Sequence, residues 1–562
     1  MSKALVRILL GILALILLLA GFVMLIATTP WGQQLVTKQV NSYLAGKLNS
    51  PFRIGRIRYS IPDYIELENV FFKTPKGDTL LDGGRMRVDL DMWGLLHNRV
   101  AINNIELEHI RLNVNRIADA TSTATNPPSF NFQYILDAFI PPGDTTKPTT
   151  PVDTTVAPLD VNLAGIFLND VRIRYRDDVV GADVNAYVDS LRAGFDKTDV
   201  SKSQYYLSNV AVNGLNAYTR LYEGIPVPSD PSDPNDSLDI GLGKWQVNKA
   251  KWDVRVETAD FKTTGSVGKL TMESDYFYLN GAKIGIKSLA MANADIAAVL
   301  TKPTKKAAST PPSSATSTAP GWQARIGTVQ FANNRIRYDD ETAPRQKNGL
   351  DYGHLDLRAF GVEGKALAYQ DLGKRGQRVS GQIRKAQFKA TSGFTLQQFD
   401  ADLLYDDKNT RLTGLYIKTP TSLLRDQLIL RYDSLAQLSD PRFAKRVSVR
   451  ANLRQSRLSV LDVLQLAPFL ADTPPFTDTR AVFRADAQAN GTLAALNIPR
   501  FGLDMLSGTH VRMSGQLTNV TDPDRIGVDL QIQDGTTRLA DINKLAPKGS
   551  IPSSIALPPC LI

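Results

Sequence analysis

The residue types that carry most enzyme and metal chemistry are few in this chain and widely spaced. Its four histidines, His97, His109, His354 and His510, occur singly, and its one cysteine is Cys560. A disulfide within the chain and a cysteine-based metal site are therefore excluded. No Gly-x-Ser-x-Gly, His-Glu-x-x-His or glycine-rich phosphate loop occurs. We expect no catalytic residues, no metal and no cofactor.

Adjacent carboxylates are the one remaining feature that could serve a hydrolase. Asp177-Asp178 and Asp339-Asp340 each follow a strand-like segment, where aspartate commonly forms turns. Turn formation is the simpler interpretation. A glycosidase pair stays open at this point, because its two carboxylates meet in space and not in sequence.

Length and charge place broad limits on the protein. A chain of 562 residues corresponds to about four domain-sized units. The net charge of +9 is compatible with an ordinary solvated surface or with contact to anionic membrane surfaces. We expect no nucleic-acid partner, since no recognised binding motif accompanies the charge.

The N-terminus contains a candidate membrane span. Ile8–Ala27 is an uncharged run of 20 residues, about 30 Å long as a helix, which matches a bilayer core. Lys3 and Arg7 precede it and place the N-terminus in the cytoplasm. A cleaved signal peptide is the alternative, but its apolar region would be shorter.

A helix is predicted directly after this run. Within Trp31–Leu48, one helical stripe carries Val36, Val40, Tyr43, Leu44 and Leu48. Such a helix could lie on the membrane surface or pack on the first strands, and the second arrangement is slightly favoured.

One strand-like segment is repeated three times, as Arg56–Tyr59, Arg172–Tyr175 and Arg335–Tyr338. Polar and apolar residues alternate in each copy, which predicts a strand with one wet face and one dry face. The copies are unevenly spaced, so the repeat is not a strict solenoid period.

The same alternation runs through much of the chain. It is unbroken over Arg85–Met92, and Lys76-Gly77-Asp78 is typical of a hairpin turn. His109 breaks the alternation, which resumes on the other parity at Ile110 and predicts a bulge or turn there.

These patterns predict a mainly β protein: an N-terminal transmembrane helix, then an elongated, curled, repeat-type β-sheet with an open groove and a few short helices. The expected segments are an anchor (1–28), an amphipathic helix (29–50), β segments (51–119, 159–300, 321–455), a Thr/Pro linker with a short helix (120–158), a low-complexity linker (301–320) and a final, apparently interrupted β segment with short helices (456–562).

The dry face of these strands is the candidate functional surface. The apolar residues expected to line a groove are Ile57, Tyr59, Met86, Val88, Leu90, Ile105, Leu107, Ile173, Tyr175, Ile336 and Tyr338. A closed β-sandwich, in which the same side chains pack two sheets together, is the alternative.

Several motifs resemble the TamB family, a relative of the AsmA-like proteins, and the likeness covers most of the chain. They are Thr29-Pro30-Trp31-Gly32, Ile54-Gly55-Arg56-Ile57, Leu67-Glu68-Asn69-Val70, Gly77-Asp78-Thr79-Leu80-Leu81, Trp93-Gly94-Leu95-Leu96 with 102–116, and a late Asp-x-x-x-Leu-Ala-Pro unit at 462–468 and 541–547. Long Thr/Pro insertions suggest a Bacteroidetes-type member.

The resemblance implies a single-pass inner-membrane protein with its bulk in the periplasm. It implies phospholipid acyl chains as partners, and a role in phospholipid transport to the outer membrane or in protein assembly there, with no enzymatic activity. Contact with a BamA/TamA-type barrel would use a C-terminal region that this sequence lacks, so we expect a fragment of a longer protein. An anchored β-sandwich scaffold of a secretion or envelope-assembly system, without lipid transfer, is the alternative.

Overall fold

A computed structural model describes most of the chain. The described residues are 29–60, 63–91, 100–119, 122–123, 127–139, 161–199, 204–225, 239–278, 282–303, 321–373, 376–433, 446–471, 476–505, 508–520, 525–538 and 541. The chain divides into two compact units, residues 1–264 and residues 265–562. The boundary falls inside the predicted second β segment, and each unit is described by itself.

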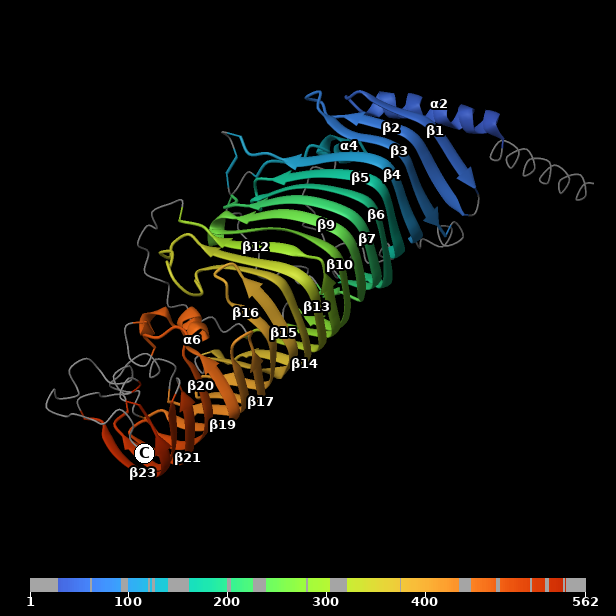
Figure 1. Ribbon diagram of the computed structural model, residues 1–562. Coiled ribbons are helices and arrows are strands. Elements are labelled where there is room, and N and C mark those ends of the chain that lie inside the picture. Colours follow the sequence, from blue (N-terminus) through green and yellow to red (C-terminus); the bar gives the residue numbers. More distant parts are fainter. Residues whose placement is uncertain are drawn as a thin grey trace, which may run out of the picture. The chain divides into compact units, whose positions relative to one another are not determined.

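Unit 1 is a single β-sheet with helices at its margins (Figure 1). Its elements are α2 (Pro30–Lys47), β1 (Phe52–Ser60), β2 (Tyr64–Lys73), β3 (Thr79–Leu90), β4 (Val100–Arg116), α4 (Gln133–Asp137), β5 (Val161–Asp177), β6 (Ala182–Asp199), β7 (Gln204–Leu221), β8 (Asp239–Gly241), β9 (Lys244–Val256) and the 3₁₀ turn η3 (Glu257–Ala259). Strands β1 to β7 pair in chain order, and both β8 and β9 pair with β7.

Unit 2 is also one sheet in its described part. Its elements are β10 (Phe261–Tyr278), β11 (Lys283–Ala292), β12 (Asp295–Leu300), β13 (Gln323–Asp340), β14 (His354–Asp371), β15 (Gln377–Ala390), β16 (Thr395–Asp406), β17 (Asn409–Lys418), β18 (Leu423–Arg431), β19 (Ser448–Ser459), α6 (Val460–Leu466), the 3₁₀ turn η6 (Pro468–Leu470), β20 (Val482–Thr492), β21 (Ala495–Met505), β22 (Thr509–Thr518) and β23 (Gly527–Thr536). From β13 onward each strand pairs antiparallel with the next.

The mainly β prediction is therefore confirmed, and the described strands of each unit form one sheet, not two packed sheets. The predicted span Ile8–Ala27 lies outside the described residues. Among the residues that are described, no helix has the length and apolar character needed to cross a membrane.

Parallel pairing occurs where the sequence predicts linkers. The pairs β4–β5, β7–β9 and β12–β13 are parallel, whereas hairpins join most other neighbours. A parallel neighbour requires the chain to return along the length of the strand. The predicted linkers at 120–158 and 301–320 fall in two of these connections. Within the first, the predicted short helix is confirmed as α4, and the rest of both linkers lies largely outside the described residues.

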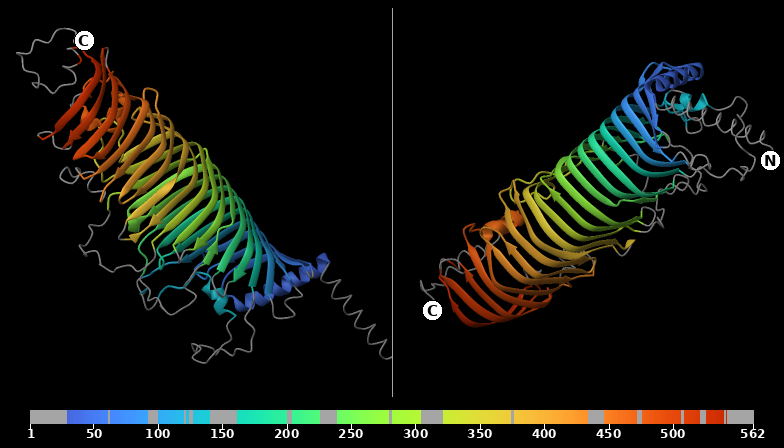
Figure 2. Two further views of the ribbon diagram at one scale, coloured as in Figure 1. Left: turned by 90° about the horizontal axis from the view of Figure 1, so that it is seen from below. Right: turned by 90° about the vertical axis from the view of Figure 1, so that its right-hand side faces the viewer.

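The strands of unit 1 are bent (Figure 2), and β2, β4, β5, β7 and β9 each contain one mid-strand residue with left-handed backbone, in register across the sheet. Asn69, His109, Asp170 and Lys249 have φ of 50–54°, and Gly214 has φ of 66°. Such left-handed backbone reverses the alternation of side chains without ending the strand. The break predicted at His109 is thus confirmed, and it belongs to a line that crosses the sheet.

Glycines complete this line where neighbouring backbones come too close for a side chain. Gly55 lies opposite Asn69, and Gly84 lies opposite His109. A Cβ atom on Gly55 would lie 2.9 Å from the Cβ of Asn69, and one on Gly84 would lie 3.0 Å from the Cβ of His109. Asp189 lies opposite Gly214, where a Cβ atom would collide with its carboxylate. We call the set Gly55, Asn69, Gly84, His109, Asp170, Asp189, Gly214 and Lys249 the bend line.

Unit 2 has positive φ values at corresponding interruptions of its pairing, at Asn293, Asn333, Ala359, Lys385, Gly414, Asp426 and Gln455. The side chain of Asn333 donates to that of Asn293 at 2.8 Å. Asn334, only 1% exposed, accepts a hydrogen bond from the backbone of Ala294 at 2.9 Å. Side chains such as that of Asn334 thus form hydrogen bonds with backbone groups that have lost their strand partners at the bend.

Helix α2 covers the free edge of β1 in unit 1. Asn41 accepts from the backbone N–H of Ile54 at 3.1 Å and donates to its carbonyl at 2.8 Å, and Thr37 accepts from the N–H of Ile57 at 2.9 Å. These side chains replace the missing strand, which protects an edge that could otherwise pair with another chain. Val40 of α2 packs on the apolar face beside them. Packing on the first strands, the favoured arrangement, is confirmed.

Helix α6 explains the late repeated motif. The carboxylate of Asp462, 8% exposed, accepts hydrogen bonds from the hydroxyls of Thr419, Thr421 and Ser422 at 2.6, 2.6 and 2.5 Å. In the second copy, Asp541 accepts from Thr509 at 2.9 Å. In both copies the aspartate follows a strand and accepts hydrogen bonds from hydroxyl groups at the start of the preceding strand or in the turn before it. Ser459 is the N-cap residue of α6, but its side chain makes no capping hydrogen bond.

The bend line can be tested at Asn69, which is exposed and left-handed. Replacing Asn69 by valine should destabilise β1–β3 by about 1–2 kcal/mol, because a side chain with a branched Cβ is strained in this conformation. Amide hydrogen exchange in these strands should then accelerate about 5- to 30-fold. Asn69→Gly is the matched control and should leave exchange nearly unchanged. Equal rates in the two variants would contradict the steric role of this position.

Candidate apolar binding face

Apolar side chains form continuous rows across the sheet of unit 1, because the strands are held in register. One row passes through every strand from β1 to β7 and then β9. Its members are Ile57, Leu67, Met86, Leu107, Leu168, Leu191, Val212 and Val247. A second row lies on the other side of the bend line and consists of Phe52, Phe72, Leu81, Leu112, Ile173, Ala186, Ala217 and Trp252.

The structure brings most of the predicted residues together on this face. Ile57, Met86 and Leu107 are members of the first row, and Ile173 belongs to the second. Tyr59, Val88 and Ile105 form a further row through Ile65 of β2. Leu90 lies opposite Ile102 at the end of β3, and Tyr175 lies opposite Val114.

The two predicted residues of unit 2, Ile336 and Tyr338, also lie in rows of apolar side chains. Ile336 lies opposite Ile296 and Leu357, and Tyr338 opposite Ala298 and Leu355. Leu355 and Leu357 in turn pack on a small core of Leu350, Ala390 and Phe394. The eleven predicted residues therefore lie on the apolar faces of two units and do not form one local site.

Burial on this face is greatest beside the bend line. Val70, Ile110 and Val171 are 1%, 2% and 1% exposed, and they lie in one row with Ile54 and Val188. Side chains on the inside of a bend converge and cover one another, which accounts for this burial. The apolar rows therefore lie on the inner side.

Away from the bend, the cover of the same face is uneven: Val210, Val212 and Val247 are 4%, 5% and 7% exposed, whereas most of its other apolar side chains are half-buried. Of the eleven predicted residues Ile57 is buried, and the others are half-buried. Ile65, in the row of Tyr59, is 37% exposed. In the described part of unit 1, α2 covers the β1 end of this face, where Val40 and Leu44 pack against Ile54 and Ile57. Side chains of this type are normally buried, so a half-covered row of them is unusual for a soluble surface.

The opposite face of the same strands is charged. Arg56, Glu68, Arg85 and Glu108 lie opposite one another on β1 to β4, with alternating sign. Arg85 is 2.8 Å from Glu66 and 2.7 Å from Glu108, and the hydrogen bond that Arg85 donates to Glu66 is the main cause of the raised pKa of Arg85. A strand shifted by one residue would lose these pairs and would turn its apolar residues toward water.

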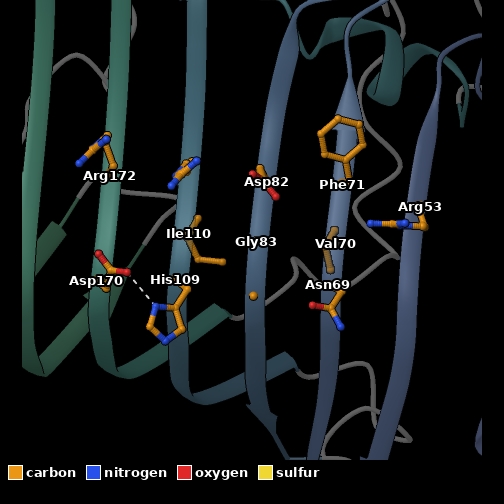
Figure 3. A pocket seen from close by; sticks show the side chains of 12 residues that line it. Arg53, Asn69, Val70, Phe71, Asp82, Gly83, His109, Ile110, Asp170 and Arg172 are labelled. Carbon is orange, nitrogen blue, oxygen red and sulfur yellow. Dashed lines mark hydrogen bonds and ion pairs between the residues drawn. The ribbon is translucent and has the colours of Figure 1, made fainter.

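A depression on the charged face follows the bend line. It has a volume of about 390 Å³, and the residues that line it include Gly83 and Gly84 (Figure 3). His109 and Asp170 meet across it at 2.7 Å, and the hydrogen bond from His109 lowers the pKa of Asp170. Among the described residues, no group of three or more His, Cys, Asp or Glu side chains could hold a metal. We assign this depression to the geometry of the bend.

Tyr175, one of the predicted residues, connects the apolar face to a buried charge. Its hydroxyl donates to Asp177 at 2.8 Å, and Arg116 donates to the same carboxylate from 2.8 Å. Burial tends to raise the pKa of Asp177, but these bonds and the N–H groups of Val179 and Val180 outweigh it and lower the pKa. The predicted turn role of Asp177 is therefore confirmed.

Sequence reasoning missed the cross-strand members of the rows, including Leu67, Phe72, Leu81, Leu168 and Trp252. Each stands at an apolar position of its own strand, so alternation alone could have selected it. Which residues become neighbours depends on the strand register and on which strands pair in parallel, and the sequence of one strand shows neither.

The buried charge predicts a pH dependence. Asp177 has a lowered pKa in the folded chain, so its contribution to stability is complete above its unfolded pKa of about 3.9 and is lost as the pH falls below that value. The urea midpoint of the protein should exceed that of Asp177→Asn at pH 7, and the gap should narrow below about pH 4. Asp196→Asn, at an exposed position, is the control and should show little difference. A gap that persisted unchanged in acid would argue against a charge-based role.

Comparisons of the chain with protein-family models, with curated proteins and with solved structures found no match. Its function must therefore be inferred from the apolar face itself.

Proposed function

We propose that this protein is a TamB-like, inner-membrane-anchored periplasmic protein whose bent sheet forms an open groove for the acyl chains of phospholipids. In this role it supports phospholipid transport toward the outer membrane. The proposal includes no catalytic step, cofactor or metal. The observation that carries it is the set of apolar rows, continuous across eight strands. Among the described residues the second row is half-buried throughout, and the first row is half-buried except at the buried Ile57, Val212 and Val247.

The dimensions of the rows suit a hydrocarbon chain. Eight strands have seven gaps of about 4.8 Å, so a row in unit 1 extends about 34 Å. That exceeds the roughly 15 Å of hydrocarbon contributed by one leaflet of a bilayer. An acyl chain could therefore lie wholly within one row. If the chain moved along the row, each apolar contact that it lost would be replaced by a similar one.

The energetics also favour a lipid ligand. Exposing a hydrocarbon chain to water is unfavourable by about 0.8 kcal/mol for each CH₂ group. Covering ten methylenes would thus remove about 8 kcal/mol of the barrier to crossing an aqueous compartment. The rows contain no charged side chain, so the face would hold hydrocarbon without selecting a particular lipid head group.

An assembly role with an outer-membrane barrel follows from the family resemblance alone. No residue in the described units supports it specifically, so we give it second place. The scaffold alternative without lipid transfer would leave the half-covered apolar rows without an occupant. For that reason we favour lipid binding over the scaffold.

Site-specific photo-cross-linking in membranes containing the full chain tests the proposal. Benzoylphenylalanine at Leu191, on the inner face, should cross-link phospholipid that mass spectrometry can identify. The same group at the adjacent Arg192, on the charged face, is the control and should not. Equal labelling at both positions, or none at Leu191, would count against a lipid-binding face.

A charge placed on the inner face should weaken lipid binding. Ala217 is half-buried in the second row, and its neighbour Asn216 is exposed on the other face. An arginine at position 217 that displaces two or three methylenes would cost about 2 kcal/mol, lowering the amount of lipid cross-linked at Leu191 about 30-fold. Asn216→Arg is the control and should leave cross-linking unchanged. Circular dichroism checks that the two variants are folded to the same extent.

A further inference from the structure

Helix α2 has an apolar side that its contacts with the sheet leave uncovered. Thr37, Asn41 and Leu44 face β1, as the hydrogen bonds and core contacts show. Trp31 and Leu35 are 63% and 51% exposed. At 3.6 residues per turn, these two positions lie on the side of the helix opposite the sheet. Large exposed apolar side chains on the outside of a helix suggest a contact surface.

The charge and residue types of α2 indicate what this surface contacts. The helix contains no acidic residue, and its ionisable side chains are Lys38, Lys47 and Tyr43. Lysine is attracted to anionic lipid head groups, and tryptophan and tyrosine are enriched where a membrane meets water. Tyr43 is 56% exposed and lies on the flank of the same apolar side.

The position of α2 in the chain points to the same occupant. The uncharged run Ile8–Ala27 ends two residues before Thr29. Thr29 is the N-cap of α2, and its hydroxyl accepts from the N–H of Gly32 at 3.3 Å, so the helix begins immediately. Trp31 is four residues beyond Ala27 and can be no more than about 14 Å from the end of the run, even if the chain between them is extended.

We propose that Trp31, Leu35 and Tyr43 contact the membrane surface, so that one side of α2 binds the bilayer while the opposite side binds the first strand. One side binds the lipid surface, and the other side binds the edge of β1 through Thr37 and Asn41. The helix is about 10 Å thick, so the first strand would be held about that distance from the head groups. This inference uses the membrane anchor of the proposed function but does not depend on acyl-chain binding by the sheet.

Fluorescence quenching in the full chain tests the proposal. The environment-sensitive dye NBD is attached at Leu35→Cys, and separately at Tyr43→Cys, in a Cys560→Ser background. The protein is reconstituted into phosphatidylethanolamine–phosphatidylglycerol vesicles. Doxyl-labelled lipid in these vesicles should quench both dyes, whereas iodide in the water should quench them weakly. Ala211→Cys, at an exposed position on β7, is the control, with iodide quenching the dye and doxyl lipid leaving it unaffected.

Two other outcomes would overturn the inference. Iodide quenching at position 35 as strong as at position 211 would show that the helix side is in water. Protection from both quenchers would show that protein covers it, for example a second copy. Retained doxyl quenching together with absent phospholipid cross-linking at Leu191 would reject lipid binding by the sheet while leaving this inference intact.

Discussion

The structure depends on left-handed backbone placed in the middle of strands that otherwise alternate regularly. A residue at positive φ moves the next side chain to the opposite parity, so a strand can bend and keep its apolar residues on one side. In unit 1 this happens at matching positions of neighbouring strands, which is why pairing continues on both sides of the bend. A bend out of register would break the ladder and expose backbone groups.

Steric fit explains which residues occupy the bend line. Asparagine and aspartate tolerate left-handed backbone better than most residues, and they hold several of these positions, such as Asn69 and Asp170. Opposite them, Gly55 gives the room that a Cβ atom would take. Gly214 combines both demands, since its φ is 66° and a Cβ there would collide with the carboxylate of Asp189. The line is therefore specified by local geometry and not by a ligand.

The strands themselves were easier to predict from the sequence than their pairing partners and register. Alternation over Arg85–Met92 and the parity break at His109 were sufficient for β3 and for one bend. The parity break at Asn69, between Leu67 and Val70, is equally visible but was not recognised as part of a line. The rows could not be predicted, because joining Leu107 to Leu168 requires knowing that β4 and β5 are parallel and in which register. Long-range register is set by the whole pattern of apolar and charged partners.

A half-covered apolar face would normally make a protein prone to association, and two features of unit 1 counter this tendency. Helix α2 occupies the edge of β1, where another strand could otherwise add. The charged outer face, with Arg85 bonded to Glu66 and Glu108, fixes the register that keeps the apolar residues inside. Neither feature fills the inner face beyond its β1 end, where Val40 and Leu44 of α2 pack. A protein selected only for stability would gain more by burying those rows under a second layer. Incomplete cover of these rows in the described part of the chain is the observation on which the proposed lipid-binding role depends.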